Sequence, residues 1–284
     1  MILQKEINEN SVKFKVPPAT IDKDWVLGHL LNGIVSFEEL KNLLIFKGGT
    51  CLKKCFFENY RFSEDLDFTL LDEKFEITEK LIRAILKITE KNSGAFFDFK
   101  LIKNQIHNDV DQGYEVKIKF WGANHKANQK PLPPSRWQTE IKLDISFSEK
   151  LLSEPEIHQI IHAYSDEDLI TEKVKTYSMQ EIVAEKVRSL VQRNRPRDVF
   201  DNWYFSKQIK TSLYPIIKNL LIQKAQNKNV DISKLENFVN EKKKNANKRA
   251  WESSLAHQIS KEHLPDFDEA FNSLQPFIEK ILNS

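Results

Sequence analysis

The sequence predicts an α/β protein, with strands and helices in its first half and mostly helices in its second half. Short apolar or alternating runs, typical of strands, occur between residues 43 and 147. Amphipathic stretches with a period near 3.6 residues dominate from residue 179 onward. The 284 residues, 40% of them hydrophobic, suffice for two domains, because a domain typically has ~100–200 residues. We therefore expect domains at residues 1–160 and 161–284.

The first half of the chain alternates between strand and helix patterns. The strands are expected at 43–46, 65–71, 95–102, 114–121 and 138–147. A helical pattern at 50–57 separates the first two strands, and an amphipathic helix at 76–91 follows the second. The apolar residues of this second helix lie on one stripe, as on a helix that covers a sheet. The proline-containing stretch 124–136 predicts an exposed loop.

Strand patterns stop after about residue 149, and the rest of the chain should be mostly helical. Apolar residues recur at helical spacing at 182–191, 199–205, 213–221, 232–239 and 267–281. The segment 241–249, EKKKNANKR, is strongly basic and precedes Trp251. It could contact an RNA backbone, whereas most charge runs of this length are solvated helix faces.

Charge and cysteine content limit the class of protein. The 43 Lys and Arg residues against 41 Asp and Glu leave a net charge of +2, so an anionic partner must meet a local patch. Cys51 and Cys55 are too few for a disulfide scaffold and indicate a reducing compartment. No apolar run approaches the ~18 residues that a membrane helix needs, and the first residues lack the apolar core of a signal peptide. We expect a cytoplasmic protein without a membrane segment.

The glycine pair Gly48-Gly49 lies between a predicted strand and a predicted helix. The chain has only 7 glycines, so this pair indicates a backbone position that a side chain would block. Such a turn lets backbone N–H groups approach an anion at the start of a helix, as in phosphate-binding loops. By itself this pattern is weak evidence for a phosphate site.

Carboxylates follow the glycine pair on predicted strands. Asp65 and Asp67 lie two residues apart on one strand, so both side chains emerge from the same face of the sheet. Close carboxylates repel unless a cation lies between them, which predicts a hard divalent metal such as Mg²⁺. An isolated pair also fits a solvated strand face. Asp144, on an otherwise apolar strand, favours the metal site because a charge in such a place needs a partner or a metal.

Two other patterns suggest different chemistry. His158 and His162 have the spacing of a helical zinc-protease motif, but Gln159 stands where the general-base glutamate would be. These histidines are better explained as solvated or structural. Cys51 and Cys55, one helical turn apart, could be redox-active, but packing as small hydrophobic residues fits their amphipathic helix better.

The run GGTCLKKCFFENYRFSEDLDF resembles the signature of the nucleotidyl transferase AbiEii/AbiGii toxin family, within the DNA polymerase β-like nucleotidyltransferase superfamily. The segment DKDW at 22–25 resembles the N-terminal helix of that family. The segments EIVAEKVRSL at 181–190 and RPRDVFD at 195–201 resemble its downstream motifs. The resemblance covers roughly residues 20 to 205. It implies a polymerase β-like mixed sheet with flanking helices, followed by a mostly helical C-terminal domain.

The resemblance also implies roles for individual residues. It implies a nucleotide-binding set of Gly48, Gly49, Thr50, Ser63 and Lys142. It implies catalytic roles for Asp65, Asp67, Asp144, Lys186 and Asp198, the first three also being metal ligands. The last acidic position stays open, because Asp201, Glu181 and Glu185 compete with Asp198.

The function implied by the resemblance is a metal-dependent nucleotidyltransferase that moves a nucleoside monophosphate from a nucleoside triphosphate to an acceptor hydroxyl. Mg²⁺ or Mn²⁺ would be its cofactor, and RNA such as tRNA, or a protein, its acceptor. It would act as the toxin of a toxin–antitoxin or abortive-infection system in phage defence, with a cognate antitoxin encoded nearby. Two alternatives stay open: a nucleotide-binding module that acts by protein contact, and transfer to a small molecule such as an antibiotic. The nucleotide, the acceptor, the antitoxin and the oligomeric state are not decided by the sequence.

Overall fold

The computed structural model describes residues 1–103, 106–107, 110–111 and 113–284. The chain divides into two compact units: unit 1 comprises residues 1–151 and 155–177, and unit 2 comprises residues 152–154 and 178–284. This boundary follows Tyr177, later than residue 160, because two strands beyond residue 155 join the sheet of unit 1.

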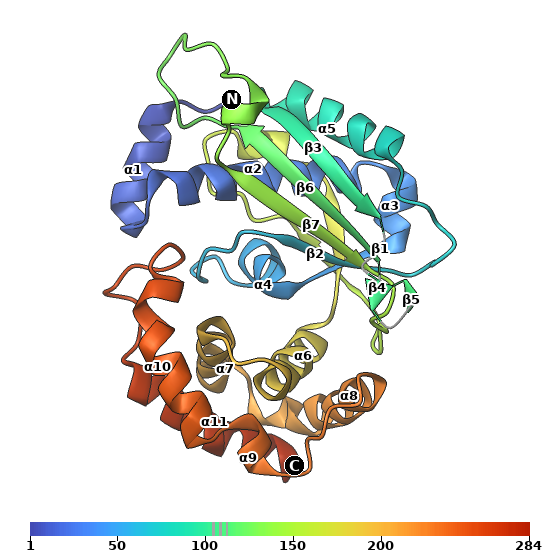
Figure 1. Ribbon diagram of the computed structural model, residues 1–284, viewed down its shortest axis with the longest axis vertical. Helices are drawn as coiled ribbons and strands as arrows, with labels where there is room; N and C mark the ends of the chain where they lie inside the picture. The colour runs from blue at the N-terminus through green and yellow to red at the C-terminus, as the bar shows by residue number, and fades with distance from the viewer. Residues whose placement is uncertain (104–105, 108–109, 112) are drawn as a thin grey trace. The chain divides into compact units, whose positions relative to one another are not determined.

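Unit 1 is built on a mixed sheet (Figure 1). Its strands, in the part of the chain described, lie in the order β3-β6-β7-β2-β1-β9-β8. Their bounds are β1 (Leu44–Lys47), β2 (Leu66–Leu70), β3 (Phe96–Lys103), β6 (Gly113–Trp121), β7 (Glu140–Ser146), β8 (Glu156–Gln159) and β9 (Lys173–Thr176). The short strands β4 (Ile106–His107) and β5 (Val110–Asp111) pair separately. β2 pairs with β7, and β1 with β9, in parallel, whereas the other neighbours are antiparallel. The mixed sheet and its five expected strands are confirmed.

Strands β8 and β9 were not expected, and the prediction that strands end after residue 149 is wrong. Each has only four residues. Charged and polar residues dominate both, with Ile157 and Val174 as their apolar members. So short a segment carries too little alternation to be recognised. Pairing decides its conformation instead, since β9 pairs with β1 and β8 with β9.

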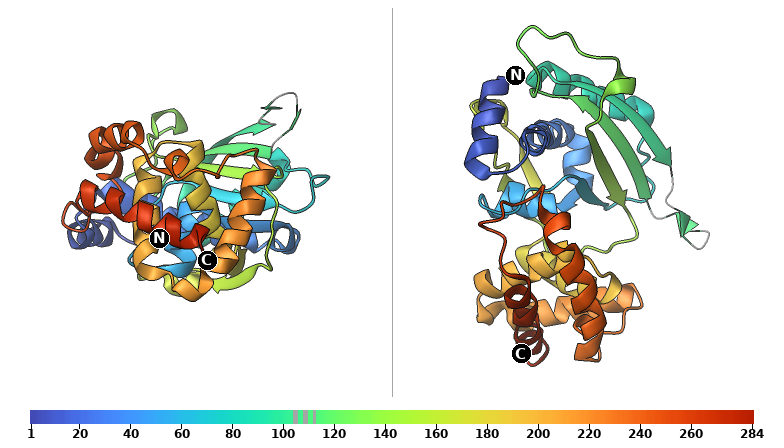
Figure 2. Two further views of the ribbon diagram at one scale, coloured as in Figure 1. Left: turned by 90° about the horizontal axis from the view of Figure 1, so that it is seen from below. Right: turned by 60° about the vertical axis from the view of Figure 1, so that its left-hand side comes forward.

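Helices of unit 1 lie on one side of the sheet. The elements are α1 (Gln4–Phe14), α2 (Pro18–Val35), α3 (Glu38–Leu43), α4 (Gly48–Cys51), a π-helical turn (Leu52–Phe56) and α5 (Glu79–Ser93). Helices α2 and α5 contact each other behind the sheet (Figure 1, Figure 2). Nearly every residue of α2 from Ile21 onward is buried, which is typical of a helix that is covered on all sides.

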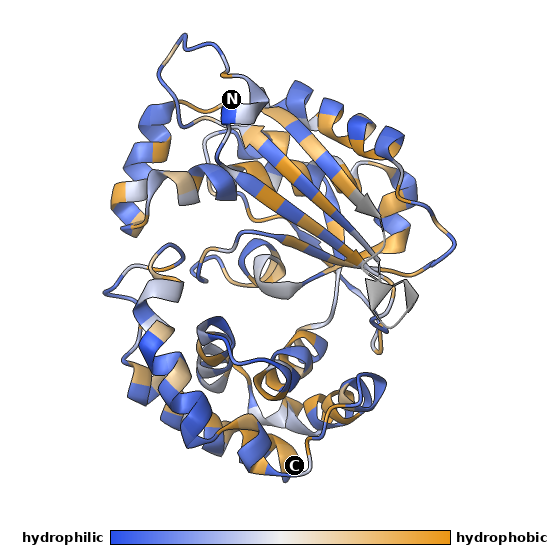
Figure 3. Cartoon of the chain, viewed as in Figure 1, coloured by the Kyte–Doolittle hydropathy of each residue, from blue (hydrophilic) through white to orange (hydrophobic). Residues whose placement is uncertain are grey.

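Hydrophobic and hydrophilic residues alternate along the central strands (Figure 3). On β7, Ile141, Leu143 and Ile145 are buried, whereas Lys142 and Asp144 between them are half-buried. This alternation follows from the two-residue period of a strand. The apolar residues form the core, and the intervening positions are left for charged side chains.

The regular secondary structure of unit 2 consists of helices in the residues described, as expected for the second half. Its helices are α6 (Met179–Gln192), α7 (Pro196–Gln208), α8 (Tyr214–Asn227), α9 (Leu235–Phe238), α10 (Glu241–Leu255) and α11 (Phe267–Leu282). Ser178 caps α6 by accepting the N–H of Glu181 at 3.2 Å. Lys224 of α8 is fully buried and pairs with Glu181 at 2.7 Å and Glu185 at 3.0 Å, which ties α8 to α6. Among the helices described in either unit, none is both long enough and apolar enough to cross a membrane.

Asp22 of α2 is a buried carboxyl group with a raised pKa. Its Oδ1 accepts the backbone N–H of Ala123 at 2.7 Å, which fastens the chain after β6 to the helix. Burial raises the pKa of Asp22 to about 6, because the opposing hydrogen bonds from Ala123 and Asn124 do not offset the loss of solvation. The raised pKa means that the ionised form is the one that destabilises the fold.

Asp22→Asn should stabilise the protein above its folded pKa. The contribution of Asp22 to the free energy of unfolding is fully present below the pKa of 3.8 that the group has in the unfolded chain. This contribution is lost as the pH rises through about 6, the pKa in the folded protein. Two pKa units correspond to roughly 3 kcal/mol as an upper bound. We expect a higher free energy of unfolding for the variant at about pH 8 and little difference at about pH 4. Chemical denaturation at both pH values checks this, with exposed Asp72→Asn as the control; a less stable variant at the higher pH would contradict it.

Candidate active site

The turn after β1 lies against the second aspartate of the Asp-x-Asp pair. Gly48 has a φ of +82°, which residues with a side chain rarely adopt. A Cβ atom at Gly48 would lie 2.3 Å from Oδ2 of Asp67. The carboxylate of Asp67 therefore occupies the space that the missing side chain leaves open.

The rest of the turn is tied to the segment that precedes β2. The hydroxyl of buried Thr50 donates to the backbone carbonyl of Asp65. A Cβ atom at Gly49 would lie 3.1 Å from both Nη2 of Arg61 and Oγ of Ser63. The hydroxyl of Thr50 thus fixes the backbone that carries Asp65. Arg61, which contacts the turn at Gly49, had no role in the sequence analysis.

The strand register brings two of the predicted metal ligands together. In the parallel pairing of β2 with β7, Asp67 is the direct partner of Asp144. Asp65 precedes β2 by one residue and lies two residues before Asp67, so alternation places it on the same side of the sheet. All three aspartates are half-buried rather than enclosed in the apolar core.

Lys142 and Glu115 complete a charged row beside these aspartates. Nζ of Lys142 lies 2.8 Å from Oδ2 of Asp144 and 2.9 Å from Oε2 of Glu115. Glu115 on β6 is the direct strand partner of Asp144. Burial lowers the pKa of Lys142, but the hydrogen bonds to Asp144 and Glu115 raise this pKa by more, so the net change is upward. The hydrogen bond from Lys142 lowers the pKa of Glu115. Both groups are therefore held in their charged forms.

Glu115 and Lys47 are site residues that the sequence analysis missed. Lys47 is the strand partner of Asp67. Its Nζ lies 5.5 Å from the centre of the Tyr177 ring. Neither residue belongs to a recognisable motif. The alternation of polar and apolar residues along their strands was the available signal, but only the strand register shows that they lie beside the aspartates.

The three aspartate side chains together form a suitable site for a hard divalent cation. Asp67 and Asp144 are adjacent, Asp65 is on the same side, and all offer the oxygen ligands that Mg²⁺ and Mn²⁺ prefer. The missing side chain of Gly48 lets the carboxylate of Asp67 take up its position. These are the residues that would hold the metal.

The predicted residues of unit 2 are engaged within that unit. Nζ of Lys186 lies 2.6 Å from Oδ2 of Asp201, and the side chain of Asp201 is fully buried. Asp198 receives two hydrogen bonds of 2.8 Å from Arg193. Of the residues that compete with Asp198 for the last acidic position, Asp201 pairs with Lys186, whereas Glu181 and Glu185 pair with Lys224.

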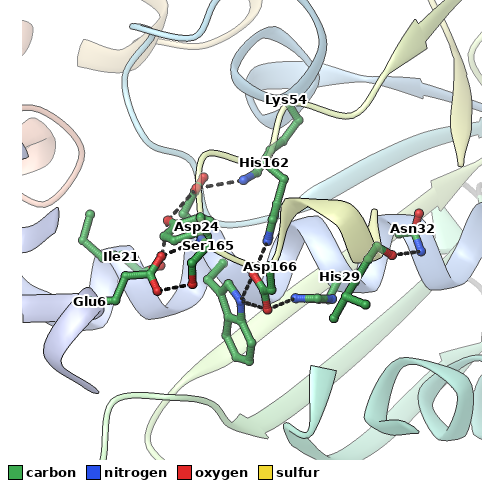
Figure 4. Close-up of polar contacts among 12 residues, drawn as sticks. Glu6, Ile21, Asp24, His29, Asn32, Lys54, His162, Ser165 and Asp166 are labelled. Carbon is green, nitrogen blue, oxygen red and sulfur yellow. Dashed lines mark hydrogen bonds and ion pairs between the residues drawn. The ribbon is translucent and has the colours of Figure 1, made fainter. Parts of the chain in front are cut away.

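The zinc-protease interpretation of the histidine pair is wrong. His158 lies on strand β8 and bonds to Glu156 at 3.0 Å, whereas His162 lies in the loop beyond that strand. The helix that the motif requires is absent from the described 156–166 segment. His162 instead contacts Asp166 at 3.1 Å, and Asp166 contacts His29 of α2 at 3.1 Å (Figure 4). No sequence pattern indicated this cluster, because His29 is remote from the other two residues along the chain.

The other two patterns have structural explanations. Cys51 and Cys55 are both buried, as expected for small hydrophobic residues packed in the core, and burial raises the pKa of the Cys51 thiol. On α10, Lys244 and Lys248 pair with Asp268. Trp251 is 4% exposed and donates to the carbonyl of Pro265. Much of the basic run is therefore used to attach α10 to its surroundings.

Comparison with known proteins identifies the family. A family model described as "Nucleotidyl transferase AbiEii toxin, Type IV TA system" matches residues 29–273. The chain belongs to the AbiEii nucleotidyl transferase toxin family. Proteins of this family are toxins of type IV toxin–antitoxin systems, so the protein is a nucleotidyltransferase toxin with an antitoxin as its counterpart.

A solved structure shares the fold of this AbiEii family member. MenT4, a nucleotidyltransferase toxin from Mycobacterium tuberculosis H37Rv, superposes with a TM-score of 0.67 at 16% identity, covering 100% of this chain and 91% of that chain. The fold predicted from the sequence is confirmed by this likeness. A comparison with curated protein sequences finds no match.

Gly48→Ala should displace the carboxylate of Asp67. The added methyl group would meet Oδ2, and the positive φ would be strained. We expect nucleotide transfer to fall by roughly 10²-fold or more, as for a lost transition-state contact. Gly94→Ala is the matched control, because Gly94 also has a positive φ, of 76°, and faces Met1 instead. If both variants retain transfer equally, the turn does not position Asp67.

Lys186→Met should destabilise the protein. Removing one partner of a buried ion pair leaves an uncompensated charge, here on Asp201, at a cost of about 3–5 kcal/mol. Adding Asp201→Asn should restore part of the stability. Lys207→Met, which breaks an exposed pair with Glu269, should cost less than about 1 kcal/mol. Equilibrium denaturation measures the free energy of unfolding of all three variants, and a Lys186→Met variant as stable as wild type would contradict this prediction.

Proposed function

We propose that this toxin transfers a nucleoside monophosphate from a nucleoside triphosphate to an acceptor hydroxyl, with Mg²⁺ or Mn²⁺ as the cofactor. The observation that supports this is the register of β2 and β7, which pairs Asp67 with Asp144 next to the glycine turn. Carboxylates so close together are expected where they share a cation. Asp65, Asp67 and Asp144 would be the metal ligands.

The reaction is an in-line displacement at the α-phosphorus. The acceptor oxygen forms a bond to phosphorus, the bond to the bridging oxygen breaks, pyrophosphate leaves, and the hydroxyl proton passes to solvent. When bound, the metal offsets the charge on the attacking and leaving oxygens. The three aspartates would orient the reacting groups, and the Gly48-Gly49-Thr50 turn with Ser63 would accommodate the phosphates.

Lys142 has a positioning role in this proposal. Its ammonium lies between Asp144 and Glu115, so it orients the Asp144 carboxylate while staying charged. An ammonium so placed would also attract the negatively charged phosphates. The role of Glu115 would be to keep Lys142 in this position when Asp144 binds the metal.

In unit 2 the proposed catalytic residues are Lys186 and Asp198. Each has a partner within the unit, Asp201 for Lys186 and Arg193 for Asp198. These ion pairs fix the two side chains in defined orientations. The last acidic position remains a proposal among Asp198, Asp201, Glu181 and Glu185.

The acceptor we propose is RNA such as tRNA, or a protein, in the cytoplasm of the host cell. The family supports the toxin role, and we propose that it serves abortive infection in phage defence, neutralised by an antitoxin encoded nearby. Incorporation of label from each α-³²P nucleoside triphosphate into cellular RNA, protein and small hydroxylated drugs would identify both substrates.

Asp67→Asn and Asp144→Asn should each abolish label transfer. Loss of a metal contact worth several kcal/mol corresponds to roughly a 10³-fold slower reaction. Without metal, the melting temperature of Asp67→Asn should be unchanged or higher, because removing one charge relieves repulsion between the carboxylates. Glu140→Gln is the matched control, since Glu140 lies on the same face of β7 and pairs with Lys119 in the neighbouring strand. Full transfer by either aspartate variant would overturn the proposal.

A further inference from the structure

Unit 1 contains a second group of metal-ligating side chains, formed by His29 of α2 with His162 and Asp166 of the loop after β8 (Figure 4). Nε2 of His29 lies 3.1 Å from Oδ2 of Asp166, and Nε2 of His162 lies 3.1 Å from Oδ1 of Asp166. The ligand atoms of all three residues lie within 4.8 Å of one another. The three carboxylates of the candidate active site are not part of this cluster.

The surroundings hold these side chains in place. The side chains of both histidines are 1% exposed, and that of Asp166 is 12% exposed. Nε1 of Trp25 donates to the carboxylate of Asp166 at 3.1 Å and 3.2 Å. Nδ1 of His162 faces the backbone of Gly28, where a Cβ atom would lie 2.3 Å away. Packing therefore sets the orientation of the His162 ring, and the indole N–H of Trp25 orients the carboxylate of Asp166. Metal-binding side chains are commonly oriented in this way by hydrogen bonds from residues that do not bind the metal.

The three side chains lie close enough together to share one metal ion, because their ligand atoms are all within 4.8 Å of one another. Ligand atoms around a tetrahedral zinc, with bonds of about 2.0–2.1 Å, are separated by roughly 3.3 Å. The two nitrogen-to-oxygen separations of 3.1 Å are close to that value. Two imidazoles and one carboxylate suit first-row transition metals better than Mg²⁺, which prefers oxygen ligands.

We propose that His29, His162 and Asp166 bind one transition-metal dication, Zn²⁺ being the best match, with water as the remaining ligand. Such an ion fastens α2 to the loop that leads into β9, and β9 pairs with β1 directly before the glycine turn. Its role is structural, and it is separate from the metal of nucleotidyl transfer.

The test uses the full-length, tag-free protein after treatment with a chelator, with Mg²⁺ in excess to occupy the active-site carboxylates. Calorimetric titration with Zn²⁺ should show one site per chain. Addition of Co²⁺ should give the intense visible absorption of a tetrahedral complex. An absence of stoichiometric Zn²⁺ binding, or of the Co²⁺ absorption, would overturn the proposal.

His29→Gln separates a metal site from a hydrogen-bond cluster. A glutamine amide can still donate to Asp166, so the cluster would survive, but it is a poor ligand for the metal. We expect Zn²⁺ affinity to fall by roughly 10²-fold or more, in this variant and in Asp166→Asn, with little change in the melting temperature of the metal-free protein. His158→Gln, a change outside the cluster, should bind Zn²⁺ normally. Wild-type affinity in His29→Gln would mean that the histidines form only a hydrogen-bond cluster.

Discussion

The parallel register of β2 and β7 is the constraint on which the candidate active site depends. It makes Asp67 the direct neighbour of Asp144, and through β6 it adds Glu115 to the same row. A shift of one residue would turn every side chain of a strand to the opposite face. The apolar residues between the charged positions, such as Phe68 and Leu143, are buried and prevent such a shift. The core therefore determines the position of the carboxylates.

Helix α2 is the second element that organises unit 1. It is buried on nearly all sides, yet it carries four buried polar side chains, each with a partner elsewhere in the unit. These contacts are Asp22 with the N–H of Ala123, Asp24 with Lys54, His29 with Asp166, and Asn32 with the N–H of Glu172. Because a buried polar group without a partner is costly, each contact specifies where another segment of unit 1 attaches to the helix. Several segments of unit 1 are thus held in place by one element.

Features that depend on neighbouring residues could be predicted from the sequence, whereas features that depend on contacts between distant residues could not. The glycine turn, the Asp-x-Asp pair and the main strands are local patterns, so they were predicted within a few residues. Strands β8 and β9 depend on pairing with β1, and the partner of Lys186 depends on how α6 packs against α7. Glu115 and the cluster around His29 were missed for the same reason, since their neighbours are far away along the chain. Sequence patterns identify chemical groups, and the register decides which of them meet.

The central claim, that the β2–β7 register builds a metal-binding nucleotidyltransferase site, is tested most directly by crystallography with Mn²⁺ and a non-hydrolysable nucleoside triphosphate. The account predicts an anomalous peak within bonding distance of Asp67 and Asp144, with the triphosphate next to the turn at Gly48. Manganese and nucleotide bound elsewhere, with these two carboxylates lacking a metal, would contradict it.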